Sequence, residues 1–193
     1  MKTKSNIILL TIIILIIGFN IFEVSQFKIN NNKNIGITTH KLGYITCLSI
    51  EDNVKATISE GDSNLVKVSP EIEMFYSAGC LSIRGRGIAN LTLQKNTLTA
   101  LSLEKIASIE GVVGDSLQYI QSSGNSYAKI KGGVIDNLEI NIKDNAKIKL
   151  NVKKIVNLTG KIRDVAVVKI YGKVDSSKID NSAIKGKLEI IGK

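Results

Sequence analysis

The chain has 193 residues, 44% of them apolar, which is enough for one folded domain with a sizeable core and argues against a second domain. It carries 26 Lys and Arg against 17 Asp and Glu, a net charge of +9, with one histidine and two cysteines. One histidine and two cysteines argue against a Ser-His-Asp triad and a Cys/His zinc cluster. We therefore expect no catalytic residue, no metal and no cofactor.

Residues 1–25 are predicted to be a signal anchor or signal peptide that forms one N-terminal hydrophobic helix. Lys2 and Lys4 precede a mostly apolar run from Ile7 to Phe22, which as a helix is about 24 Å long against a bilayer core of about 30 Å. No pair of small residues at cleavage spacing follows the run, which favours an uncleaved anchor over a cleaved signal. The rest of the chain is then periplasmic, extracellular or secreted, and the protein belongs to the cell envelope.

Residues 26–41 are rich in asparagine and offer few apolar side chains, so they are interpreted as a polar linker. His40 lies at the end of this stretch without a nearby His, Cys or carboxylate at ligand spacing. It is expected to be an exposed loop residue.

Residues 42–193 are predicted to be a single all-β domain whose final part has a twenty-residue period. Apolar and polar residues alternate in short segments whose central members are Ile130, Leu150, Ile170 and Ile190. Such a recurrence is typical of a β-solenoid with rungs of about twenty residues, because each coil buries its apolar face against the next. A β-sandwich of evenly spaced strands is the alternative, but it has no physical reason to keep one period.

The order of strand and turn patterns in this domain also resembles a known family. Strand patterns at 44–50, 53–61 and 65–69 precede Gly79-Cys80-Leu81-Ser82-Ile83, and Gly-Asn-Ser and Asp-Asn turns follow. This order is similar to the GIN domain, a DUF2807-like family described as auto-transporter adhesin heads, over about residues 40–193. The resemblance implies an envelope protein with a right-handed β-solenoid and no catalytic motif. Several Ser-Gly turn pairs of the family are Asp-Asn or Arg-Asp in this chain.

Cys47 and Cys80 each begin the tetrapeptide Cys-Leu-Ser-Ile, so they are expected at equivalent positions of neighbouring strands. Strands about 4.8 Å apart bring the two α-carbons within bridging range. Two alternatives remain open, a disulfide suited to an exported protein and two small buried thiols.

The positive charge lies in the last third of the chain. Residues 28–128 hold nine basic and nine acidic residues, whereas residues 129–193 hold fifteen basic and seven acidic. The twenty-residue period stacks the basic residues into two predicted ladders, Lys129 with Lys149 and Lys169, and Lys153 with Lys173 and Lys193. Stacked like charges cost stability, which motivates binding of an anionic polymer such as lipopolysaccharide or acidic polysaccharide. The alternative is a solvated face that discourages edge-to-edge pairing.

The leading hypothesis is thus a non-catalytic, membrane-tethered or exported envelope protein that presents an adhesion or interaction surface. The first alternative is a structural spacer that forms homo-oligomers, because Leu188, Ile190 and Ile191 lie near the C-terminus with no polar capping segment after them. A polysaccharide-acting enzyme is a remote alternative, since the acids lie mostly in turns beside a basic residue. Scattered tyrosines and the lack of a recognition module argue against dedicated nucleic-acid binding.

Overall fold

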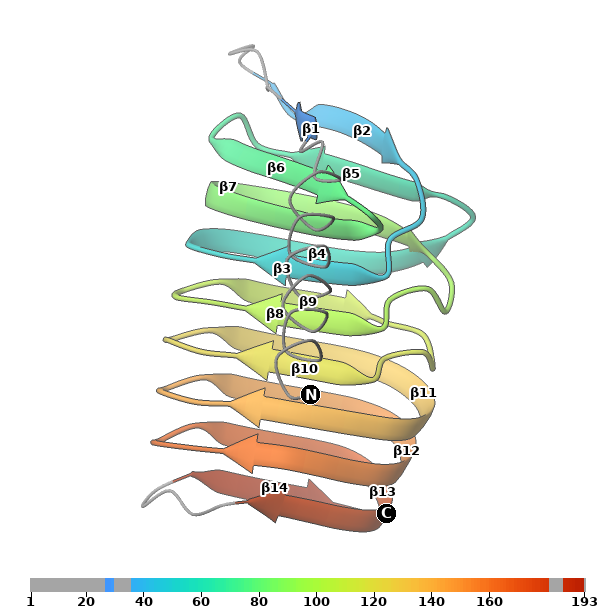
Figure 1. Cartoon of the computed structure of the whole chain (residues 1–193), viewed down its shortest axis with the longest axis vertical. Coiled ribbons are helices and arrows are strands. Elements are labelled where there is room, and N and C mark those ends of the chain that lie inside the picture. The colour runs from blue at the N-terminus through green and yellow to red at the C-terminus, as the bar shows by residue number, and fades with distance from the viewer. Residues whose placement is uncertain (1–26, 30–35, 181–185, 193) are drawn as a thin grey trace, which may run out of the picture.

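A computed structural model describes residues 27–29, 36–180 and 186–192, and this part of the chain is all β, without a helix. Its strands stack along the long axis of the molecule, with the N-terminal strands at one end and β14 at the other (Figure 1). The strands are β1 (Phe27–Ile29), β2 (Thr38–Leu42), β3 (Cys47–Ile50), β4 (Asn53–Gly61), β5 (Asn64–Val68), β6 (Ile72–Ser77), β7 (Cys80–Gln94), β8 (Ala100–Leu103), β9 (Ser108–Val112), β10 (Tyr119–Ser122), β11 (Tyr127–Ile142), β12 (Lys147–Ile162), β13 (Val167–Asp180) and β14 (Lys187–Ile191).

The expected fold class, a right-handed β-solenoid, is wrong. Seven strands pair in parallel and close on themselves into a barrel, in the order β3, β7, β4, β9, β11, β10, β8 and back to β3. A solenoid requires each coil to pair only with the coils before and after it. Here β3 lies between β7 and β8, out of chain order. The two halves of β7 pair with β3 and with β4, and the two halves of β11 pair with β9 and with β10.

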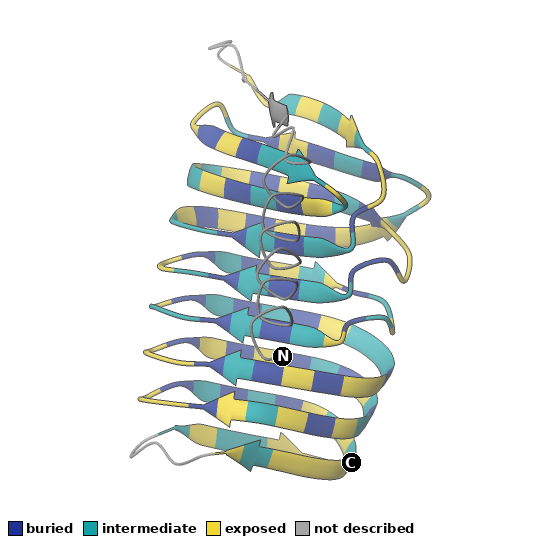
Figure 2. Ribbon diagram, viewed as in Figure 1, coloured by how far each residue is buried: buried dark blue, intermediate teal, exposed yellow. Residues whose placement is uncertain are grey.

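The predicted twenty-residue alignment is nevertheless present beyond the barrel. β12, β13 and β14 add in parallel to β11, and Ile130 pairs with Leu150, Leu150 with Ile170, and Ile170 with Ile190. Ile130, Leu150 and Ile170 are fully buried, whereas Ile190 is 43% exposed because no further described strand covers it. Alternation of buried and exposed residues along each strand gives one apolar core inside the stack (Figure 2).

The N-terminal end of the stack is antiparallel. β5 and β6 pair antiparallel with β7, β2 with β5, and β1 with β6. The stretch predicted as a polar linker, residues 26–41, therefore contains β1 and most of β2. His40 is a half-buried strand residue rather than an exposed loop residue, and its Nε2 lies 3.2 Å from the Thr38 hydroxyl. Partial burial lowers the pKa of His40.

The predicted signal anchor, residues 1–25, lies outside the described residues. Among the residues that are described, no helix has the length and hydrophobicity needed to cross a membrane.

Candidate functional site

A ladder of tight turns fixes one corner of the stack. Gly124, Asp144 and Asp164 stand at intervals of twenty residues and all have left-handed backbone, with φ of 72°, 61° and 59°. The Asp144 carboxylate accepts a hydrogen bond from the Gly124 N–H at 2.9 Å, and the Asp164 carboxylate accepts one from the Asp144 N–H at 3.0 Å. Both aspartates are thus held by the turns, as the sequence predicted for turn formers.

These turns place two cations, Lys143 and Arg163, one layer apart. Each residue is the first after its strand segment, and its N–H donates to a carbonyl of the layer before it, Lys143 to Ser122 and Arg163 to Ile142. Both side chains are exposed. The turn ladder therefore fixes the bases of two cationic side chains in neighbouring layers.

A second column lies two residues earlier along each strand. Gln121 of β10 pairs with Asn141 of β11, and Asn141 pairs with Lys161 of β12. The side chains of this column point outward because Ser122, Ile142 and Ile162, which follow them, are buried. Amide, amide and ammonium groups thus follow one another across three strands.

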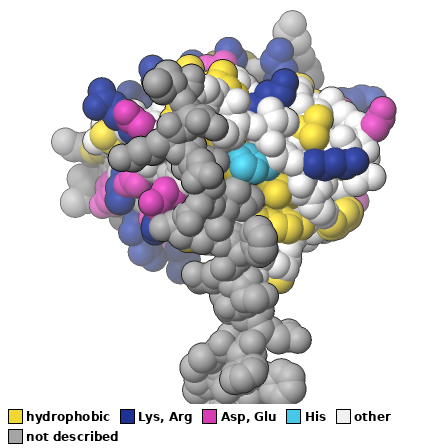
Figure 3. Space-filling model, turned by 90° about the horizontal axis from the view of Figure 1, so that it is seen from above, with side chains coloured by type: hydrophobic (Ala, Val, Ile, Leu, Met, Phe, Trp, Pro, Cys, Tyr) yellow, Lys and Arg dark blue, Asp and Glu magenta, His cyan; other side chains and the backbone are white. Residues whose placement is uncertain are grey.

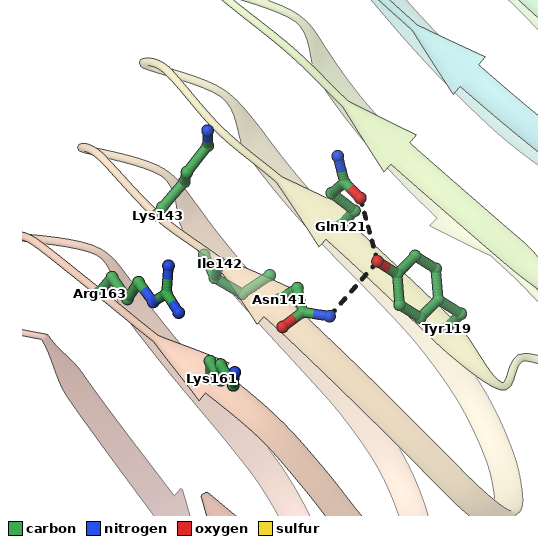
Figure 4. Close-up of a pocket in the computed structure, with 7 residues that line it drawn as sticks. All are labelled: Tyr119, Gln121, Asn141, Ile142, Lys143, Lys161 and Arg163. Atoms are coloured by element: carbon green, nitrogen blue, oxygen red, sulfur yellow. Dashed lines mark hydrogen bonds between the residues drawn. The ribbon is translucent and has the colours of Figure 1, made fainter. Parts of the chain in front are cut away.

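The two columns enclose a surface hollow of about 250 Å³, which we call the basic hollow. Its lining residues come from β10, β11, β12 and the turns after them: Tyr119, Gln121, Asn141, Ile142, Lys143, Lys161 and Arg163. The Tyr119 hydroxyl donates to the Gln121 side-chain oxygen at 3.0 Å and accepts from the Asn141 amide at 3.3 Å (Figure 4). The neutral side of the hollow is therefore held in place by its own hydrogen bonds.

Carboxylates lie near the cations of the hollow but form no ion pair with them among the described residues. Lys143, Lys161 and Arg163 form no ion pair with any described residue. Among the acids beside the hollow, Glu139 accepts a hydrogen bond from Asn141 at 3.0 Å. Asp180 pairs with Lys161 along the backbone of β13 and β12. Three cations beside hydrogen-bonding amides form an arrangement that can hold an anionic group.

The first predicted lysine ladder exists, but carboxylates flank it. Lys129, Lys149 and Lys169 pair in register on β11, β12 and β13. Lys129 forms an ion pair with Glu110 at 3.3 Å and Lys169 one with Glu189 at 2.8 Å. The hydrogen bond from Lys169, with a further one from Lys187, lowers the pKa of Glu189 to about 2. As a binding surface, this ladder stays a prediction.

The second predicted ladder, Lys153 with Lys173 and Lys193, does not form as expected. The register between β12 and β13 shifts by one residue after Asn151, so Lys173 pairs with Lys154 and not with Lys153. Asp175 lies between these two lysines, 2.6 Å from Lys154 and 3.1 Å from Lys173, and its pKa is lowered by its hydrogen bonds to them. Lys193 lies outside the described residues.

Cys47 and Cys80 form a disulfide, one of the two alternatives that the sequence left open. They are direct partners on β3 and β7, with α-carbons 4.6 Å apart. Cys80 is exposed, so a pair of buried thiols does not describe the site.

At the N-terminal end of the stack, charges of both signs are mixed. Viewed from that end, basic, acidic and apolar side chains are interspersed over the antiparallel strands (Figure 3). No cluster of three or more metal-ligating side chains occurs within the described ranges.

The residues of the basic hollow were not predicted from the sequence to form a binding site. The signal was present, because Lys143 and Arg163 are twenty residues apart, as are Gln121, Asn141 and Lys161. The interval alone does not show on which face of the molecule each column lies.

Comparison with known proteins gives structural neighbours only. No family model matches the chain, and no curated protein matches it. Three solved structures described as a “putative adhesin” align with most of it. The structure from Bacteroides fragilis is 11% identical, with a TM-score of 0.41 and coverage of 84% of this chain and 96% of that chain. The structure from Parabacteroides distasonis is 12% identical (TM-score 0.43, 84% and 96% covered), and that from Parabacteroides merdae 13% (0.39, 83% and 97%). The resemblance to the GIN domain family stays a prediction.

Proposed function

We propose that this chain is a non-catalytic binding protein of the cell envelope that holds anionic groups of a surface polymer in the basic hollow. The observation that carries the proposal is the convergence of Lys143, Lys161 and Arg163 on one hollow without an ion-pair partner among the described residues. Cations gathered around a concave surface raise the local concentration of anionic ligands.

A non-catalytic role fits the surroundings of the acidic residues near the hollow. Asp144 and Asp164 accept hydrogen bonds from turn N–H groups, and Glu139 accepts one from Asn141. These carboxylates stabilise local structure, and His40 lies on β2 at the antiparallel end of the stack. Binding of a polymer by an envelope protein of this kind amounts to adhesion, with the apolar residues 7–22 as its anchor or export segment.

The test replaces the three cations of the hollow together, as Lys143→Gln, Lys161→Gln and Arg163→Gln. A matched control replaces Lys129, Lys149 and Lys169 by glutamine, which removes the same charge from a different surface. We expect the hollow variant to bind dextran sulfate at least about tenfold more weakly in biolayer interferometry, since each charge-assisted contact contributes on the order of 1 kcal/mol. The control should stay within about threefold of the parent chain. Equal weakening of both variants would mean that net charge alone governs binding.

A second candidate, end-to-end assembly of copies, is favoured by the exposed apolar residues of the last strand. Ile190 and Ile191 are each 43% exposed, and in the described part of the chain β14 pairs only with β13. An unpaired edge of this kind is a template for another strand.

A further inference from the structure

A strip of small side chains leads from the basic hollow along the same face of the molecule. Its two outward columns follow the pairing of neighbouring strands from β6 to β10. One column holds Phe75, Ser82, Ser49, Ser102 and Gln121, and the other holds Ser77, Cys80, Cys47, Ala100 and Tyr119. Between the aromatic residues at its ends the strip carries only Ser, Ala and the disulfide, so it is uncharged and its side chains are small; we call it the trough.

A second hollow, of about 210 Å³, lies at the far end of this trough. It is lined by side chains of β3, β6 and β7, among them Phe75, Tyr76, Ser49 and Ser82. Strands about 4.8 Å apart place the two hollows on one line of about 29 Å, counted from β6 to β12. The face thus offers an extended site, aromatic at one end and cationic at the other.

The charge at the border of the trough changes sign along this line. The outward position after Ser49 is Glu51 and the one after Ser102 is Glu104, whereas the equivalent position is Lys143 directly after β11 and Arg163 directly after β12. On β7 it is Arg84, which forms an ion pair with Glu73 at 2.8 Å. The trough is therefore flanked by carboxylates in its middle and by cations at the basic hollow.

We propose that this face binds a linear polysaccharide in which acidic sugars are separated by neutral ones; this inference rests on the proposed function of the basic hollow. A neutral sugar matches the uncharged trough, where serine hydroxyls offer hydrogen bonds. The Phe75 ring adds an apolar surface on the part that the Arg84 guanidinium, 4.5 Å from the ring centroid, does not cover. An acidic sugar fits the basic hollow. A chain with a charge on every unit would bring anions against Glu51 and Glu104, which is unfavourable electrostatically. The same repulsion acts against a nucleic acid backbone.

The first experiment fills the trough without touching the hollow. Ser102→Phe places a large side chain in its middle, and Ser108→Phe on β9 is the matched control, since Ser108 is also half-buried and pairs outside the trough. The probes are a hyaluronan octasaccharide, in which glucuronate alternates with a neutral sugar, and the glucuronate monomer. We expect Ser102→Phe to weaken octasaccharide binding at least tenfold and monomer binding less than twofold, with both unchanged in Ser108→Phe.

The second experiment tests selectivity and does not depend on how well Ser102→Phe folds. The double variant Glu51→Gln/Glu104→Gln should bind polygalacturonate, which is acidic at every unit, at least fivefold more tightly, with a smaller gain for hyaluronan, which carries half as many carboxylates along the trough. Unchanged polygalacturonate affinity, or unchanged octasaccharide affinity in Ser102→Phe, would overturn the polysaccharide assignment while the anion site stands. Failure of the Lys143, Lys161 and Arg163 variant to weaken monomer binding would instead overturn the proposed function.

Discussion

Single glycines allow the backbone of one layer to lie directly against the next. Gly160 of β12 has φ of 130°, and a Cβ at this position would lie 1.9 Å from the Ile140 carbonyl oxygen of β11. An L-residue is strained at this φ whatever space is available. The layers next to the basic hollow therefore depend on a residue without a side chain.

Gly160→Ala should lower the free energy of unfolding by about 1 to 3 kcal/mol, through backbone strain and the clash with Ile140. Gly132→Ala is the control, because its nearest neighbours would lie 3.4 Å or more away and its backbone is not left-handed. Urea unfolding followed by circular dichroism measures both. Equal stability of the two variants would contradict this prediction and would mean that the two layers can move apart with little loss of free energy.

Among the elements, β3 lies out of chain order and is joined to a neighbouring strand by a covalent bond. It inserts between β7 and β8, and the disulfide from Cys47 to Cys80 links it to β7 across 33 residues of chain. A cross-link over a loop of this length typically stabilises a fold by about 2 to 4 kcal/mol, mainly by restricting the unfolded chain.

Reduction should therefore lower the thermal unfolding midpoint of the parent chain by several degrees. The double variant Cys47→Ala/Cys80→Ala should unfold at the lower midpoint already and should not respond to the reductant. Differential scanning fluorimetry with and without a thiol reductant measures both. Complete reduction is checked by alkylation and mass measurement. If the midpoint of the parent chain did not change on complete reduction, the disulfide would have no stabilising role.

The contrast between β3 and the last strands explains how much of the fold could be predicted. From β11 to β14 each residue pairs with the residue twenty positions on, apart from one register shift, so counting along the sequence finds Ile130, Leu150 and Ile170 as one buried column. The repeated Cys-Leu-Ser-Ile predicts that β3 pairs with β7, but no interval in the sequence indicates that β3 also pairs with β8 or that seven strands close into a ring. Those pairings depend on the bends of β7 and β11, which alternation of apolar residues does not encode.

The same limit applied to the candidate site. The period brings Lys129 over Lys149 as readily as Lys143 near Arg163, because counting treats every column alike. Which column has cations without ion-pair partners depends on carboxylates from other strands, such as Glu110 beside Lys129. Such contacts between strands arise only once the pairing is known.

Over the whole molecule, the two ends of the stack differ in the strands that cover the apolar core. Antiparallel strands close the N-terminal end, whereas β14 leaves Ile190, which belongs to the buried column of Ile170, 43% exposed. Covering such a residue with a second copy would remove apolar surface from water and satisfy the unpaired strand edge. We therefore expect the domain to self-associate with rising concentration.

Ile190→Lys should shift this association toward the monomer, because a lysine on the strand edge opposes pairing with another chain. Val165→Lys is the matched control, since Val165 is a comparably exposed apolar residue, at 42%, that lies in a turn and not on the last strand. Sedimentation equilibrium of residues 36–193 over a hundredfold range of concentration measures the association. If the parent domain remained monomeric throughout, the molecule would act as a single binding head, and the polymer held in the basic hollow would be its partner.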